Sequence, residues 1–333
     1  MKYLYRIYQL LICLPILLVA SILTSVITVL GCMLGNGHFW GYYPGKLWSQ
    51  LWIRLLLLPV KVEGREHLQK NQSYVFVANH QGSFDIFLIY GFLGRNFKWM
   101  MKKALRKVPL VGIACQYAHH IFVDKSGPSK IRASYDKARE ELQEGMSLVV
   151  FPEGARTFTG HMGVFRRGAF MLADELQLPV CPLTINGSFD VKPRMKDMYW
   201  IFWHPLRLTI HEPIQPIGKG AENIKNQMTK SYDAIMSGLV PEYQGFVENL
   251  KSLPTDSYEF YSETSNAREY WNKDDGMDKE YEWLVAMPKE FFLKFVIEDV
   301  EIRLLDGSNK KYKFGNLGRV YGAQWRDWKR LNL

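Results

Sequence analysis

The hydrophobic pattern divides the chain into three regions. No Asp, Glu, Lys or Arg occurs from residue 7 to residue 43, and this run is long enough to cross a bilayer as a helix. After Gly64, short β-branched or aromatic runs alternate with longer helical stretches. Near Leu253 a polar, aromatic-rich tract begins. We therefore predict membrane-anchoring helices at 1–62, an α/β domain at 63–252 and a separate small α+β extension at 253–333.

The middle region has the alternation of an α/β fold. Its strand candidates are SYVFVANH (73–80), HHIFVDK (119–125), SLVVFPEG (147–154), PVCPLTING (179–187) and RLTIHEPI (207–214). Because their apolar residues cover both faces, we expect a central mixed, mostly parallel sheet flanked by helices. The clearest helix lies at 129–145, with Ser129 as predicted N-cap and Gly145 as its stop. In the extension, a hairpin is predicted to turn at Asp306-Gly307.

The two ends of the membrane-anchoring region carry different signals. A cleaved signal peptide has a much shorter apolar core than residues 7–43, so an anchor is the better interpretation. The following segment, 46–64, carries aromatic and basic residues that suit a membrane interface, namely Trp48, Trp52, Arg54 and Lys61. This second segment is therefore predicted to lie in the headgroup region.

Charge and cysteine content limit the partners. The 42 Lys and Arg against 33 Asp and Glu give a net charge of +9, which favours nucleic acid, an acidic membrane surface or a phosphorylated substrate. No recognised nucleic-acid motif accompanies this charge, so we expect no nucleic-acid partner. The four cysteines have no CxxC spacing, which argues against a disulfide framework or a zinc cluster.

The stretch NHQGSFD contains the first candidate for chemistry. His80 ends a predicted strand, and Gln81-Gly82-Ser83 can turn the chain so that Asp85 comes back toward the imidazole. Such a pair can act as a general base with its orienting carboxylate. The alternative is Asp85 as a helix N-cap beside a surface His80. His119 and Asp124 have the same spacing, but they are expected on opposite faces of one strand.

A second candidate follows the strand at 147–154. The loop FPEGAR places Arg156 where its guanidinium can bind a phosphate, and Arg166-Arg167-Gly168 opens the next helix. An ordinary surface ion pair between Glu153 and Arg156 is the alternative. No acidic residue lies between Asp85 and Asp124, so this whole region is electropositive, with most of its lysines expected to face solvent or lipid headgroups.

Four blocks occur in order, namely NHQGSFD, FPEGAR, FRRGA and LPVCPLTING. Over about residues 46–215 the chain resembles the glycerolipid acyltransferase family, of the lysophosphatidate acyltransferase type. The resemblance implies that His80 is the general base and Asp85 its partner. It also implies substrate-binding roles for Lys125, Glu153, Gly154, Arg156 and Pro179, the last, with Pro182, in shaping the acyl-donor site. The family pattern has Gly, Arg and Thr where this chain has His119, Lys125 and Ala155.

The resemblance further implies the reaction. A fatty acyl group would pass directly from a thioester of coenzyme A or acyl carrier protein to the free hydroxyl of lysophosphatidate, giving phosphatidate. No bound cofactor or metal is expected. Two alternatives stay open: another lysophospholipid or an amino-acid lipid as acceptor, and a non-catalytic lipid-binding scaffold.

The expected substrates bear on topology. Lys2 and Arg6 favour a cytoplasmic N-terminus, and a single crossing would place everything after residue 43 outside. A helical hairpin in one leaflet would keep both ends cytoplasmic. We favour the hairpin, because phosphorylated and thioester metabolites are cytoplasmic, and therefore expect the catalytic domain on the cytoplasmic side of the membrane.

Overall fold

The computed structural model describes residues 2–124, 128–142, 146–157, 160–193 and 200–245, and the backbone of four short strands farther along. The predicted boundary at 252/253 lies outside the described residues. The boundary at 62/63 falls within a strand, because Val60–Glu63 pairs with the sheet of the α/β domain.

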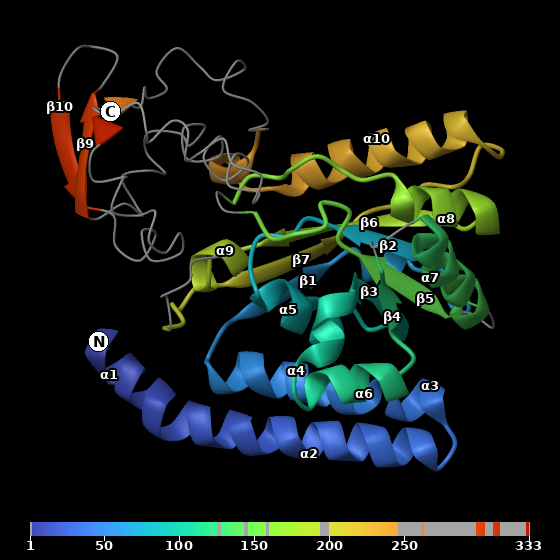
Figure 1. The fold of residues 1–333 in the computed structure, drawn as a ribbon, viewed down its shortest axis with the longest axis horizontal. Coiled ribbons are helices and arrows are strands. Elements are labelled where there is room, and N and C mark those ends of the chain that lie inside the picture. The colour runs from blue at the N-terminus through green and yellow to red at the C-terminus, as the bar shows by residue number, and fades with distance from the viewer. Residues whose placement is uncertain are drawn as a thin grey trace.

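A seven-stranded sheet forms the centre of the protein (Figure 1). Its strands are β1 (Val60–Glu63), β2 (Val75–Ala78), β3 (Phe97–Lys102), β4 (Ile121–Val123), β5 (Ser147–Val150), β6 (Val180–Asn186) and β7 (Leu206–Ile210). The order across the sheet is β1-β7-β6-β2-β5-β3-β4, and only β6 and β7 pair antiparallel. The prediction of a mixed, mostly parallel sheet is confirmed.

Two strands were not predicted, and both contain lysine. β1 reads VKVE and is only partly buried, so its apolar run is too short to stand out. β3 reads FKWMMK, yet Lys98 is buried and its ammonium donates to the Ala118 carbonyl over 2.8 Å. Lys98 was expected at solvent or lipid headgroups. Its burial requires a backbone acceptor, which sequence patterning does not reveal.

Helices cover both faces of the sheet (Figure 1). On one face α4 (Tyr43–Leu55) and α5 (Phe84–Phe92) pack against Phe76 and Ala78; on the other, α7 (Pro128–Glu141), α8 (Gly168–Leu176) and α10 (Ala221–Gly238) pack against Val75 and Val77. Successive strand side chains point to opposite faces, so the four residues of β2 supply both cores. The short elements are η2 (Arg65–His67), η3 (Lys103–Lys107), α6 (Val111–Tyr117), α9 (Ser188–Val191) and η4 (Pro241–Tyr243).

Helix α7 begins one residue earlier than predicted. Pro128 is its first residue, so Ser129 lies inside the helix and is not the N-cap. Proline is favoured in a first helical turn because its missing N–H has no intrahelical partner there. Gly145, the predicted stop, lies outside the described residues.

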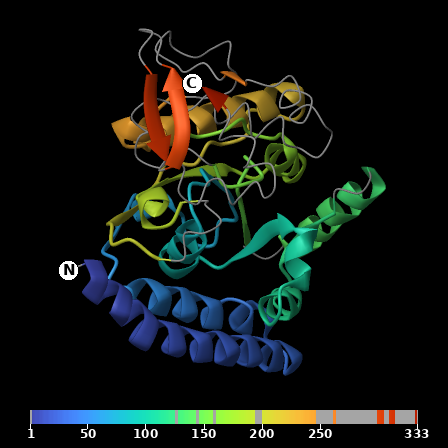
Figure 2. The same cartoon turned by 60° about the vertical axis from the view of Figure 1, so that its left-hand side comes forward.

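The N-terminal region is a pair of long helices. α1 (Lys2–Tyr8), η1 (Gln9–Cys13) and α2 (Leu14–Met33) follow one another without a break, and after α3 (Gly37–Trp40) the chain returns along them as α4. Figure 2 shows the two helices side by side beneath the sheet. Within the described residues, one helix, Tyr3–Met33, is long and apolar enough to cross a membrane, and most of its apolar side chains are exposed.

Several polar side chains of this helix contact the rest of the protein. Gln9 forms two hydrogen bonds with the backbone of Ile201, at 2.7 and 3.1 Å, and the Tyr8 hydroxyl donates to the Leu55 carbonyl. Farther along, Trp48 donates its indole N–H to Ser21, and the Trp52 ring packs on Phe87. Trp48 and Trp52 thus join α4 to α2 and α5, whereas we had expected them among headgroups.

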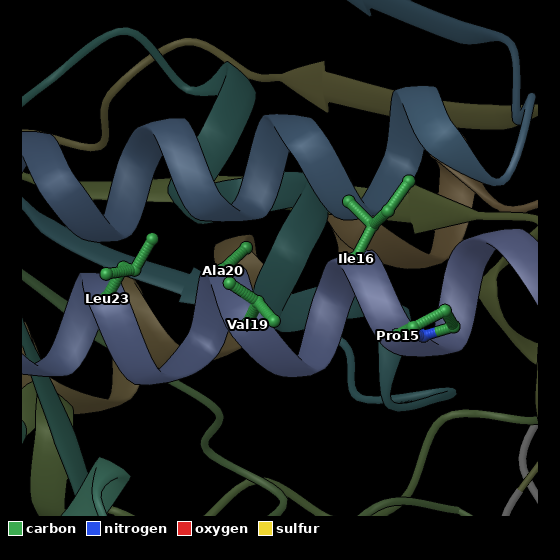
Figure 3. Close-up of a pocket in the computed structure, with 5 residues that line it drawn as sticks. All are labelled: Pro15, Ile16, Val19, Ala20 and Leu23. Carbon is green, nitrogen blue, oxygen red and sulfur yellow. The ribbon is translucent and has the colours of Figure 1, made fainter.

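The outer face of α2 is apolar. It carries an open depression of about 460 Å³. Figure 3 shows the side chains that line it, all from this one helix: Pro15, Ile16, Val19, Ala20 and Leu23. None of these side chains has a hydrogen-bonding group, so the depression suits hydrocarbon chains rather than a polar ligand.

The predicted hairpin of the extension is present in part. β9 (Glu298–Arg303) pairs antiparallel with β10 (Asn309–Lys313), and β11 (Leu331–Asn332) and β8 (Tyr261–Ser262) complete a four-stranded sheet. The turn at Asp306-Gly307 lies outside the described residues.

Asn79 joins the ends of two central strands. This buried residue follows β2; its amide donates to the Ile185 carbonyl over 2.9 Å and accepts from the Ile185 N–H over 2.8 Å. Asn79→Ala leaves two buried backbone groups unpaired, and we expect it to lower the free energy of unfolding by about 3 kcal/mol in chemical denaturation. Asn96→Ala, which removes one exposed hydrogen bond, should cost less than about 1 kcal/mol. Equal losses would contradict this role of Asn79.

Candidate active site

The candidate site lies where parallel strands end at one edge of the sheet. β2 ends at Ala78, and residues 79–83 turn the chain into α5, which begins at Phe84. Gly82 lies at the tightest point of this turn, because a Cβ there would meet the Ser188 carbonyl oxygen at 2.5 Å. The glycine lets α9 approach the loop closely enough to confine it.

The turn brings His80 and Asp85 together. The imidazole Nδ1 of His80 lies 2.7 Å from Asp85 Oδ2, and the same oxygen accepts the Gly82 N–H over 2.9 Å. Asp85 is fully buried in the first turn of α5, whereas 13% of the His80 side chain is exposed. The carboxylate accepts from Nδ1, which places the lone pair of the neutral ring on Nε2. The predicted pairing is therefore present, and Asp85 also holds the loop through the Gly82 N–H.

The His80 ring is also held by stacking. It lies parallel to the Phe151 ring, with 3.8 Å between centroids and 9° between planes, and Phe151 stacks in turn on Trp99. Phe151 follows β5, the neighbour of β2. Stacking restricts rotation of the imidazole and so fixes the direction of Nε2.

Glu153 connects the His80 loop to the loop after β5. Its Oε1 accepts the His80 N–H over 2.7 Å, and its Oε2 accepts the Gly163 N–H over 2.9 Å. Burial raises the pKa of Glu153 to about 8, and the negative charge of Asp85 adds to the rise. The two backbone N–H groups favour the ionised form and partly oppose this shift. These contacts position the backbone of His80 and occupy both carboxyl oxygens of Glu153. A phosphate is bound by cationic or N–H donors rather than by a carboxyl group, so Glu153 has no direct part in such a contact.

Arg156 supplies positive charge beside the pair. Its guanidinium is half-buried; burial lowers its pKa, and the Asp85 carboxylate opposes that shift. Gly154 has a φ of +79°, and a Cβ there would lie 3.1 Å from Arg166 Nε, so this glycine admits a second guanidinium over the loop. The loop thus gathers cations at the edge of the sheet where His80 lies.

Lys125 lies outside the described residues, but its neighbour Asp124 is described. β4 runs parallel to β3 and ends at the same edge as β2 and β5, and Asp124 pairs there with Lys103 at 2.7 Å. His119 was expected in one strand with Asp124. It instead lies before the strand with a φ of +59°, and its Nδ1 pairs with Glu141 at 2.9 Å. His119 and Asp124, the second H-x-x-x-x-D match, therefore do not pair with each other.

Pro179 is not near the His80 pair. Its carbonyl accepts from Val75 N at the start of β2, whereas His80 follows the end of that strand. Since β2 and β6 are parallel, Pro179 lies at the opposite edge of the sheet. Its role in shaping the acyl-donor site remains an expectation from family resemblance.

Several residues that build the site were missed from sequence. Asn79 and Phe151 are the first residues of the NHQGSFD and FPEGAR motifs, but the contacts that define their functions come from neighbouring strands. Lys192, directly after α9, is half-buried, and its pKa is lowered first by burial and then by the charge of Arg156. A lysine after a short helix gives no sequence signal of proximity to Arg156.

Nucleophilic and metal-binding groups are less prominent here. Burial raises the pKa of the Cys115 thiol to about 12, and that of Cys181 further, so both thiols are poor nucleophiles. Among the described residues, no cluster of three or more His, Cys, Asp or Glu side chains could hold a metal ion.

Comparison with known proteins gives a consistent result. Residues 59–186 match the family described as Acyltransferase. A 1-acyl-sn-glycerol-3-phosphate acyltransferase of Saccharomyces cerevisiae is 28% identical over 222 residues, covering 63% of this chain and 72% of that protein. A chloroplastic 1-acyl-sn-glycerol-3-phosphate acyltransferase of Arabidopsis thaliana is 29% identical over 184 residues, which cover 54% of this chain. The matched part is only 50% of the length of the Arabidopsis protein.

A solved structure is similar as well. The crystal structure of the 1-acyl-sn-glycerophosphate (LPA) acyltransferase from Thermotoga maritima has a TM-score of 0.51 and 29% sequence identity, covering 58% of this chain and 76% of that one. The likeness therefore covers a little over half of this chain rather than all of it.

The raised pKa of Glu153 predicts a pH dependence of stability. From about pH 5 to pH 8 the unfolded state ionises this carboxyl near its ordinary pKa of 4.5 while the folded state keeps the proton, so stability falls as pH rises. Glu153→Gln should flatten this part of the profile in chemical denaturation. The exposed Glu212→Gln should retain the wild-type profile. A wild-type slope in Glu153→Gln would contradict the assignment.

Proposed function

We propose that the chain, which is similar to 1-acyl-sn-glycerol-3-phosphate acyltransferases, is a member of the glycerolipid acyltransferase family and transfers a fatty acyl group from an acyl thioester to the free hydroxyl of lysophosphatidate. The product would be phosphatidate, a precursor in phospholipid biosynthesis. The observation that carries this proposal is the 2.7 Å contact between His80 Nδ1 and the buried carboxylate of Asp85. This contact leaves Nε2 of His80 as the basic nitrogen, and together with the stacking on Phe151 it fixes the orientation of the ring.

The proposed chemistry is a direct transfer. His80 Nε2 takes the proton of the acceptor hydroxyl while that oxygen attacks the thioester carbonyl, and the Asp85 carboxylate stabilises the imidazolium that forms. Collapse of the tetrahedral intermediate breaks the carbon–sulfur bond, and His80 returns its proton to the departing thiolate. The poorly nucleophilic Cys115 and Cys181 support a route without an acylated cysteine.

The cations beside the pair support a phosphate-bearing acceptor. Arg156 can grip a phosphate with two parallel N–H groups, and Lys192 adds charge close to it. Glu153 has a positioning role in this scheme, since its oxygens hold the backbone of His80 and of Gly163. By family resemblance, Lys125, which follows Asp124 in the sequence, would add a further cation for the acceptor phosphate.

Matched histidine variants test the reaction. With a labelled long-chain acyl thioester and lysophosphatidate, we expect His80→Asn to lower kcat by about 10³-fold, the usual contribution of a general base. His119→Asn changes the histidine of the second H-x-x-x-x-D match, which pairs with Glu141, and should retain wild-type kcat. Asparagine also tolerates the positive φ at position 119.

The outcomes separate the alternatives. Transfer to a different lysolipid or to an amino-acid lipid, lost only in His80→Asn, would keep the chemistry and change the acceptor. Equal activity in wild type and His80→Asn would contradict the base. Lipid binding by the wild type without consumption of any acceptor would favour the scaffold alternative.

We further propose that the N-terminal helices lie in one leaflet, with the α/β domain on the cytoplasmic side. Gln9, near one end of the long helix, is fixed to Ile201, and α2 packs on α4 and α6 along its remaining length. A helix held to the domain in this way cannot cross the bilayer while the domain stays at the surface. Its exposed apolar face would then lie among acyl chains.

Protease protection tests this topology. In sealed vesicles with their cytoplasmic face outward, an external protease should digest both an N-terminal tag and the α/β domain. Protection of either one alone, with the other digested, would show that the long helix crosses the membrane.

A further inference from the structure

A second apolar surface lies outside the N-terminal helices. Residues 102–113, here called the docking segment, contain η3 and the start of α6, and every residue from Lys102 to Val111 is exposed. Its exposed apolar side chains are Leu105, Val108, Leu110, Val111 and Ile113. Four cationic residues share this segment: Lys102, Lys103, Arg106 and Lys107.

The docking segment has a defined shape. Gly112 donates its N–H to the Val108 carbonyl over 2.8 Å, and a Cβ on Gly112 would lie 2.2 Å from the Arg106 carbonyl oxygen. Leu110 adopts a φ of +63°, an uncommon and strained conformation for leucine. The backbone therefore holds exposed leucine and valine side chains at a fixed turn instead of burying them.

Its position relates the docking segment to both the long helix and the site. η3 follows β3, and because β2, β5 and β3 are parallel, the segment leaves the same edge of the sheet as His80 and Glu153. Lys103 pairs with Asp124 at the end of β4 on this edge. On its other side α6 packs on α2 (Figure 1). The segment thus connects the apolar face of α2 with the edge that carries the pair.

We propose that the docking segment inserts its apolar side chains into the headgroup boundary of an anionic bilayer and holds the His80 edge against the lipid from which the acceptor enters. Interleaved cationic and apolar side chains suit an anionic lipid surface, since cations bind headgroup phosphates while apolar groups enter the acyl boundary. Residues 86–123 contain no acidic residue to repel such a surface. This inference rests on the proposed function for its acceptor, but its lipid contact is independent of catalysis.

Site-directed labelling tests the contact without using activity. An environment-sensitive dye is attached to Leu110→Cys in the full chain, with the half-buried Cys32 and Cys115 replaced by serine, in vesicles containing phosphatidylglycerol and brominated lipid. The matched control is Ile217→Cys, an equally apolar exposed position near Ile214, which bridges to the opposite end of β6. We expect brominated lipid to quench the dye at 110 and not at 217. Absence of quenching at 110, including shielding there by a second copy or another protein, would overturn the proposal.

Kinetics then test the consequence for the acceptor. Leu110→Asn with Ile113→Asn should raise KM for long-chain lysophosphatidate in anionic vesicles by about tenfold, since two apolar side chains no longer enter the lipid. It should leave kcat/KM for a short-chain, water-soluble lysophosphatidate unchanged. Ile217→Asn, at the exposed control position, should change neither value. Equal losses with both acceptors would contradict a role in docking.

The two experiments distinguish the failure of each proposal. Quenching at position 110 in a protein that acylates no lysolipid would remove the proposed function and keep the lipid contact. Normal transfer without quenching would keep the function and remove the docking segment.

Discussion

The arrangement of the site depends on one buried carboxylate oxygen, Asp85 Oδ2. It accepts from His80 Nδ1 and from the Gly82 N–H, at 2.7 and 2.9 Å, in a place where the side chain has no exposed surface. A buried carboxylate without such donors is strongly destabilised, so the chain between residues 80 and 85 must turn back on itself. The same oxygen thereby orders the turn, selects the tautomer of the imidazole and stabilises the imidazolium that forms during proton transfer.

Neighbouring strands keep this turn in place. Asn79 fixes its start to β6, Glu153 fixes the His80 N–H to the loop after β5, and α9 covers Gly82. Each contact joins segments far apart in sequence at the end of the sheet where parallel strands terminate, so the rigidity of the sheet is transmitted to the pair. The docking segment leaves this edge too, which relates the position of the pair to the surface that we propose meets lipid.

Sequence predicted the parts of this arrangement that depend on local pattern. Strands with continuous apolar runs were recognised, as was the return of Asp85 toward His80, because hydrophobic runs and glycine turns are local signals. β3 was missed because its buried lysine is compensated by a carbonyl contributed by a distant residue, Ala118. For the same reason the positioning contacts of Glu153 and the proximity of Lys192 to Arg156 could not be read from spacing, and Pro179 was grouped with residues that the sheet places at its other end.

The proposed chemistry requires that Asp85 hold His80 with its proton on Nδ1 and its lone pair on Nε2. Nitrogen NMR of histidine-labelled protein, with His80 assigned by loss of its signals in His80→Asn, measures this tautomer directly. We expect a protonated Nδ1 and an unprotonated Nε2 for neutral His80, and loss of that preference in Asp85→Ala. A proton on Nε2 in the wild type, or the same tautomer after removal of the carboxylate, would contradict it.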